Sequence, residues 1–90
     1  MKVLYSKAFD KDIDKINDKE IFFRLNKVIE EVKVAKDKRY ISNMKKIKGS
    51  KDYYRIKIGD YRIGIKVNDR GDEVEFIRFA HRKDIYKYFP

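Results

Sequence analysis

The sequence predicts an α+β fold in which an antiparallel meander sheet carries an N-terminal helix hairpin on one face. Two periodic patterns support this. Apolar residues recur at helical spacing from residue 7 to residue 35, and they alternate with a period of two from Tyr53 to Phe79. The expected element order is β-α-α-β-β-β. A chain of 90 residues fits one domain, so we expect residues 1–90 to form a single domain.

The N-terminal third is predicted to form a strand and two helices. Lys2–Tyr5 is short and β-prone, and Ser6 is a candidate N-cap for the first helix. Asn17 is followed three residues later by Glu20, as in a capping box that starts a second helix over residues 19–35. A connection this short predicts an antiparallel hairpin. The apolar stripes of the two helices are Phe9, Ile13 and Ile16, then Ile21, Phe22, Leu25, Val28, Ile29 and Val32.

A basic connector over residues 36–52 shows no regular period. We expect four of its residues to anchor it in the core: Tyr40, Ile41, Met44 and Ile47. Three strands are predicted next, at Tyr53–Ile58, Tyr61–Val67 and Val74–Phe79. Gly59-Asp60 joins the first two as a hairpin turn that needs a positive φ at Gly59. Residues 84–90 should add one closing helical turn.

The charge is uneven along the chain. Lys and Arg number 24 against 15 Asp and Glu, for a net +9. Residues 1–32 hold seven basic and seven acidic residues, so residues 33–90 carry the whole excess. Such an excess indicates a polyanionic partner: nucleic acid, anionic lipid or an acidic protein. Because the chain has no cysteine and one histidine, we expect no disulfide, no metal site and no cofactor. Short apolar runs predict no membrane partner and a cytoplasmic location.

Strand alternation sorts the side chains of the last three strands onto two faces. Ile56, Ile63 and Phe79 are typical of the core side, where Ile77 is also expected. The predicted open side carries Arg55, Lys57, Arg62, Lys66 and Arg78, with Tyr53 and Phe76 between them and a hollow at Gly64. A merely solvated face usually mixes signs, whereas basic groups with interleaved aromatics suit single-stranded RNA. The connector adds further RNA-binding candidates, Lys45, Lys46 and Lys48.

Two stretches carry a resemblance to a known family: YRIKIGDYRI at residues 54–63 and AHRKDIY at residues 80–86. The chain resembles the RelE family of type II toxins, within the wider RelE/ParE fold. The resemblance implies a ribosome-dependent mRNA endoribonuclease, held inactive by an acidic, RelB-like antitoxin. The family's basic positions correspond to Arg55, Lys57, Arg62 and Arg82, and its C-terminal tyrosine corresponds to Tyr86. His81 departs from some members, so His81 and Tyr86 could share or exchange roles.

The same residues permit metal-independent RNA cleavage by attack of a 2′-oxygen on the adjacent phosphate. That route needs a base, an acid and cations for the developing charge. Tyr86 or His81 is the candidate base, and Arg82 or Arg62 would stabilise the phosphorane. Lys57 and Arg55 would bind phosphate. Two other functions compete: a ParE-like inhibitor of DNA gyrase, and an RNA-binding module without catalysis.

Overall fold

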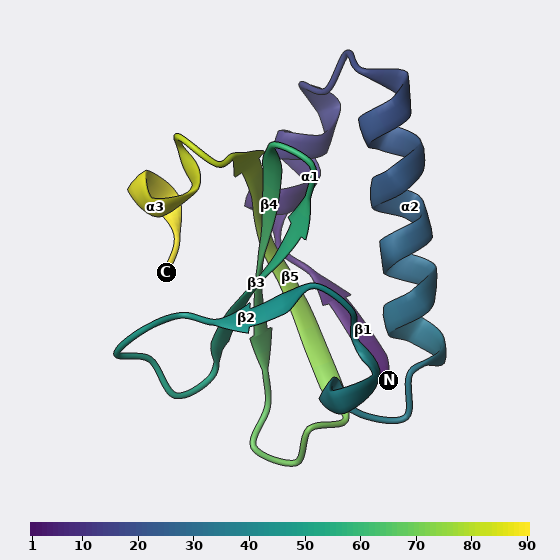
Figure 1. Ribbon diagram of the computed structural model, residues 1–90, viewed down its shortest axis with the longest axis vertical. Coiled ribbons are helices and arrows are strands. Elements are labelled where there is room, and N and C mark those ends of the chain that lie inside the picture. Colours follow the sequence, from purple (N-terminus) through teal and green to yellow (C-terminus); the bar gives the residue numbers. More distant parts are fainter.

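A computed structural model describes residues 1–90. The chain forms a five-stranded sheet that lies between helices (Figure 1). The sheet order is β1-β5-β4-β3-β2. The strands are β1 (Lys2–Tyr5), β2 (Met44–Lys46), β3 (Tyr53–Ile58), β4 (Tyr61–Val67) and β5 (Glu73–His81). The helices are α1 (Lys7–Asp14), α2 (Lys19–Val34) and α3 (Ile85–Tyr88), with a short 3-10 turn at Lys38–Tyr40. The predicted α+β class and the closing turn are confirmed.

The sheet is mixed, so the expectation of a purely antiparallel sheet was wrong. β1 pairs in parallel with β5, and Val3 lies opposite Val74. Every other pair of neighbouring strands is antiparallel. Parallel pairing needs a long crossover between the two strands, and both helices together with most of the sheet lie between β1 and β5 in the sequence.

β2 is an edge strand that the sequence did not indicate. It pairs with β3, with Lys45 opposite Arg55. A strand of three residues is too short to show an alternation of apolar and polar side chains, so the sequence pattern does not predict it. Ile41 and Met44 do pack against the core, and Ile47 is half-buried. Tyr40 is 62% exposed, so its prediction as an anchor was wrong.

The helices begin at polar caps. The Ser6 hydroxyl accepts a hydrogen bond from the Phe9 amide at 3.0 Å, which confirms the first cap. The second cap is Asp18 rather than Asn17, because the Asp18 carboxylate accepts from the amides of Glu20 and Ile21. α1 and α2 run in opposite directions on one side of the sheet (Figure 1). No helix is both long enough and apolar enough to cross a bilayer.

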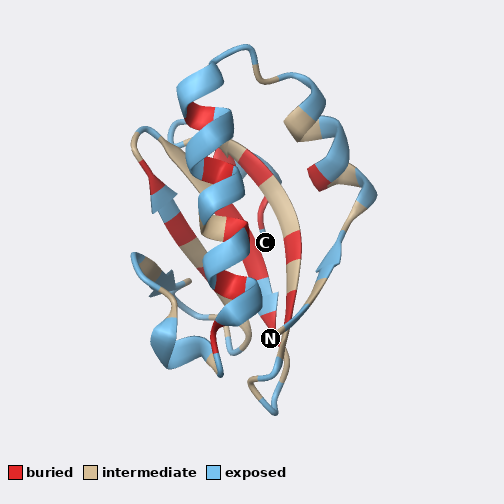
Figure 2. Cartoon of the chain, turned by 90° about the vertical axis from the view of Figure 1, so that its right-hand side faces the viewer, coloured by how far each residue is buried: buried red, intermediate tan, exposed pale blue.

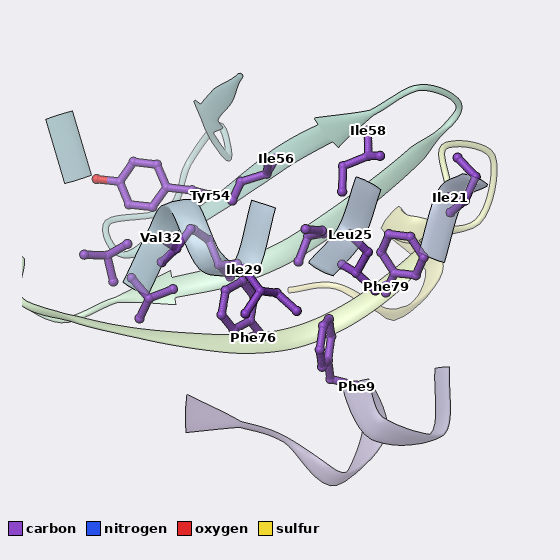
Figure 3. Packing of buried hydrophobic residues seen from close by; sticks show 14 residues of the cluster. Phe9, Ile21, Leu25, Ile29, Val32, Tyr54, Ile56, Ile58, Phe76 and Phe79 are labelled. Atoms are coloured by element: carbon purple, nitrogen blue, oxygen red, sulfur yellow. The ribbon is translucent and has the colours of Figure 1, made fainter. Parts of the chain in front are cut away.

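The core lies between α2 and the sheet. Figure 2 shows buried bands at alternate positions of the strands under this helix. Leu25 and Val32 point from α2 toward the sheet, and Phe9 enters from α1 toward Phe76 (Figure 3). The rings of Phe9 and Tyr5 each lie 5.5 Å from the ring of Phe76, measured between centroids. This aromatic cluster fixes α1 and β1 to β5.

A β-bulge changes the face that β5 presents. Gly64 lies opposite Arg78, but Ile65 lies opposite Phe76, so Ile77 is an extra residue without a partner. Phe76 is therefore fully buried, and its predicted place on the open face was wrong. Ile77, which was expected in the core, is only half-buried. Simple alternation fails here because the bulge shifts its phase by one residue.

Candidate active site

The sheet face opposite α2, here called the outer face, gathers cations in two neighbouring rows. In one row Lys45, Arg55 and Gly64 lie opposite one another on β2, β3 and β4. In the next row Lys57 lies opposite Arg62. Arg55 and Lys57 are two positions apart on one strand and therefore share a face. The alternation predicted for β3 and β4 is confirmed.

A pocket of about 370 Å³ lies at the first of these rows. It is lined by Lys45, Lys46, Ile47, Lys48, Arg55 and Tyr86, which we call the basic pocket. Its walls come from β2, the following loop, β3 and α3. Tyr86 is 59% exposed and is the one lining residue whose neutral side chain can give up a proton. The structure thus brings the three connector lysines to Arg55 and Tyr86.

Two further arginines lie at the turn between β3 and β4. The Arg62 Nη1 donates hydrogen bonds to the carbonyls of Gly59 at 2.8 Å and Tyr61 at 2.9 Å. Gly59 has a φ of 55°, as the turn required. The Arg82 amide donates to the Asp60 carbonyl at 2.7 Å, and its guanidinium lies 3.8 Å from the Asp60 carboxylate. Arg62 is therefore held in place, whereas the Arg82 side chain is largely exposed.

His81 is separated from Tyr86. On β5 it lies opposite Tyr61, and the two rings meet edge to face at 5.6 Å. Together with Tyr61 and Asp84 it lines a different pocket, of about 490 Å³. The His81 Nδ1 accepts a hydrogen bond from the Lys83 amide at 3.2 Å. No group of three or more His, Asp or Glu side chains converges to hold a metal ion.

Lys66 lies on the outer face but away from the basic pocket. It is opposite Tyr53 on one side and Glu75 on the other. Its ammonium lies 6.0 Å from the centroid of the Tyr53 ring. Lys66 is thus beside a carboxylate, unlike Arg55 and Lys57.

Arg78 is not a free cation of the outer face, because its guanidinium is paired with a carboxylate. Its Nε and Nη2 donate to the two carboxylate oxygens of Asp12 at 2.8 and 3.0 Å. These hydrogen bonds raise the pKa of Arg78 above its ordinary value. The Phe79 amide also donates to Asp12, at 2.9 Å. The guanidinium lies 4.6 Å from the centroid of the Tyr88 ring. Arg78 joins α1, β5 and α3.

The predicted hollow at Gly64 is occupied by the chain itself. The ring of Phe89 lies against Gly64, and it meets the Tyr53 ring edge-on at 5.4 Å. Neither Phe89 nor Asp12 was singled out from the sequence. A glycine inside a strand does indicate a close approach of another group, but that signal does not say which residue approaches.

Replacement of Asp12 by alanine should destabilise the fold by roughly 1–3 kcal/mol, because the Arg78 guanidinium and the Phe79 amide would lose a charged acceptor. Urea unfolding would measure the loss. Asp14→Ala is the matched control on the same helix, since Asp14 is exposed. Equal stability of the two variants would show that the Asp12 contacts contribute nothing.

Comparisons with known proteins identify the family of the chain. A family model described as "ParE toxin of type II toxin-antitoxin system" matches residues 3–86. Toxin RelE3 of Methanocaldococcus jannaschii is 46% identical over the full length of both chains. The chain belongs to the RelE family of type II toxins. The resemblance carried by residues 54–63 and 80–86 is thereby confirmed.

Solved structures of other toxins share the fold. The toxin in the RelB-RelE antitoxin-toxin complex from Methanococcus jannaschii is 43% identical, with a TM-score of 0.78, and the alignment covers 97% of this chain and 99% of that one. The archaeal RelE-RelB complex from Pyrococcus horikoshii gives 21% identity and a TM-score of 0.72 over 93% and 97% of the two chains. The intact E. coli RelBE toxin-antitoxin complex gives 23% identity and a TM-score of 0.65, over 89% of this chain and 94% of that one. The two more distant RelE toxins share the fold alone.

Proposed function

We propose that this RelE-family toxin is a ribosome-dependent endoribonuclease that cleaves mRNA in the A site without a metal ion. The observation that carries the proposal is the basic pocket, where Tyr86 stands among four cationic residues. Phosphate groups are bound by Lys and Arg, and exposed bases stack on aromatic rings. One RNA nucleotide could use both kinds of contact in this pocket.

The reaction starts with attack by the 2′-oxygen of the RNA on the adjacent phosphorus. The 2′-hydroxyl gives up a proton, the new O–P bond forms, and the bond to the 5′-oxygen breaks as that oxygen gains a proton. The products are a 2′,3′-cyclic phosphate and a 5′-hydroxyl. Two proton transfers and a stabilised phosphorane are therefore needed.

In this proposal Tyr86 moves a proton, while Arg55 and the β2 lysines hold the phosphate. The geometry favours Tyr86 over His81, because His81 lines another pocket. Arg62 or Arg82, at the turn beside Lys57, stabilises the phosphorane. A tyrosine ordinarily has a pKa of about 10 and is a weak base at neutral pH. A site of this kind depends on an RNA that is already aligned, and the ribosome would supply that alignment.

The proposed partners are an acidic antitoxin, the ribosome and mRNA. The related toxin from Methanococcus jannaschii was solved in an antitoxin-toxin complex, and that supports an antitoxin for this chain. α2 exposes the rings of Phe22 and Phe23 to solvent, and the chain has a net charge of +9. An acidic, amphipathic segment could cover both features. Action on translating ribosomes would also place the toxin in the cytoplasm.

Primer extension on mRNA bound to programmed ribosomes tests the proposal. We expect cleavage by the unchanged toxin on ribosomes and none on free mRNA. Arg55→Gln should lower the cleavage rate about 10- to 100-fold, because a charge-assisted phosphate contact contributes roughly 1.5–3 kcal/mol.

Arg70→Gln is the matched control, since Arg70 is exposed in the loop between β4 and β5. A gyrase supercoiling assay on the same preparation separates the competing function. Inhibition of gyrase with intact mRNA would overturn the proposal in favour of a ParE-like activity.

A further inference from the structure

We infer that Phe89 is a positioning residue, which holds Tyr86 over the basic pocket by seating its ring on Gly64. The inference rests on the proposed function, since it concerns how the proposed proton-transfer group is placed. It begins from the size of α3. A helix of four residues has no stability of its own in water, so its position must come from tertiary contacts.

The tail is anchored on both sides of Tyr86. Ile85 is fully buried, and Phe89 is only 2% exposed. Both lie outside the main core cluster, and Phe89 packs on Gly64 and Tyr53 of the outer face. α3 lies on the side of the sheet opposite α2 (Figure 1). Tyr86, which lies between these anchors in the sequence, remains exposed toward the basic pocket.

The seat of Phe89 depends on the absence of a side chain at residue 64. A Cβ atom there would lie 2.5–2.7 Å from three ring atoms of Phe89, which is too close for any real contact. The Tyr53 ring meets the Phe89 ring edge-on at 5.4 Å. Gly64 lies between Arg55 and Arg78 in the sheet, so the seat adjoins the row of the basic pocket.

A second contact limits rotation of the tail. The Tyr88 ring lies 4.6 Å from the Arg78 guanidinium, measured from its centroid. Arg78 in turn donates two hydrogen bonds to the carboxylate of Asp12, whose side chain is only 9% exposed. The tail is thus buried at Ile85 and contacts the rest of the fold through Tyr88 and Phe89, on both sides of Tyr86.

Single-turnover cleavage on programmed ribosomes, at saturating toxin, tests the inference. Phe89→Ala and Gly64→Ala should each lower the cleavage rate by about a hundredfold, as expected for a displaced reacting group, with ribosome affinity unchanged. The double variant should be no slower than Phe89→Ala alone, because the two changes disturb one contact. Phe89→Leu should recover part of the rate. Tyr40→Ala is the control, since Tyr40 is exposed on the 3-10 turn.

Hydrogen exchange gives a readout that does not depend on activity. Amides of residues 85–88 should exchange faster in Phe89→Ala, while those of β3 and β4 keep their protection. Wild-type cleavage by both single variants, with Tyr86→Phe inactive, would overturn the positioning role and leave the proposed function intact. Normal cleavage by Tyr86→Phe would overturn both this inference and the proton-transfer role. Additive losses in the double variant would also overturn the inference.

Discussion

Tyr86→Phe is expected to lower the single-turnover rate of mRNA cleavage by about 10²- to 10⁴-fold, the range for loss of a general acid or base. Phenylalanine keeps the ring, so stacking on RNA and the packing of the tail should persist. The substitution removes only the Tyr86 hydroxyl, which lies among the cationic side chains of the basic pocket. Ribosome binding should therefore stay within a few-fold of the unchanged toxin, which a filter or sedimentation assay would check.

The cleavage rate of His81→Ala tests the alternative in which His81, rather than Tyr86, transfers the proton. Because His81 lines a separate pocket beside Tyr61, we expect a smaller loss than with Tyr86→Phe. The reverse order of effects would transfer the proton-transfer role to His81. Thermal unfolding of both variants should show that neither loss comes from unfolding.

Phe76→Ala should have the largest effect on stability, about 3–5 kcal/mol. Phe76 is fully buried, and it lies in contact with the rings of Tyr5 and Phe9. Removal of its ring would leave a cavity at the point where β1 and α1 meet β5. For a domain of this size each kcal/mol lowers Tm by roughly 4–8 °C, so calorimetry would detect the change readily.

Phe23→Ala is the matched control for this stability measurement. Phe23 is 68% exposed on α2, so its truncation should change the free energy of unfolding by no more than about 0.5 kcal/mol. A similarly small effect of Phe76→Ala would contradict the bulged register of β5. It would indicate that the Phe76 side chain lies on the outer face, as simple alternation predicts.

Local patterns in the sequence were sufficient for most of the fold. The Ser6 cap, the Gly59 turn and the strand boundaries of β3 and β4 follow from interactions within a few residues. Three features do not follow from such local interactions: the parallel pairing of β1, the short edge strand β2 and the bulge at Ile77. Each depends on where distant strands meet, and a period measured along one segment carries no such information.

The candidate site divides in the same way. The shared face of Arg55, Lys57 and Arg62 follows from regular alternation, and the structure agrees. His81 and Tyr86 are near in sequence and were expected to share or exchange roles, yet they line different pockets. Asp12 pairs with Arg78 through a contact that spans 66 residues, so Arg78 is not a free cation. Charge counts cannot reveal such pairing.

The parallel pairing of β1 with β5 also sets an order of events during synthesis. β1 is made first, but its partner residues 73–76 lie 71 positions later in the chain, since Lys2 pairs with Glu73. Contacts this far apart in sequence slow folding, because a long loop must close before they form. The sheet that carries the basic pocket can therefore be completed only when nearly the entire chain has been made.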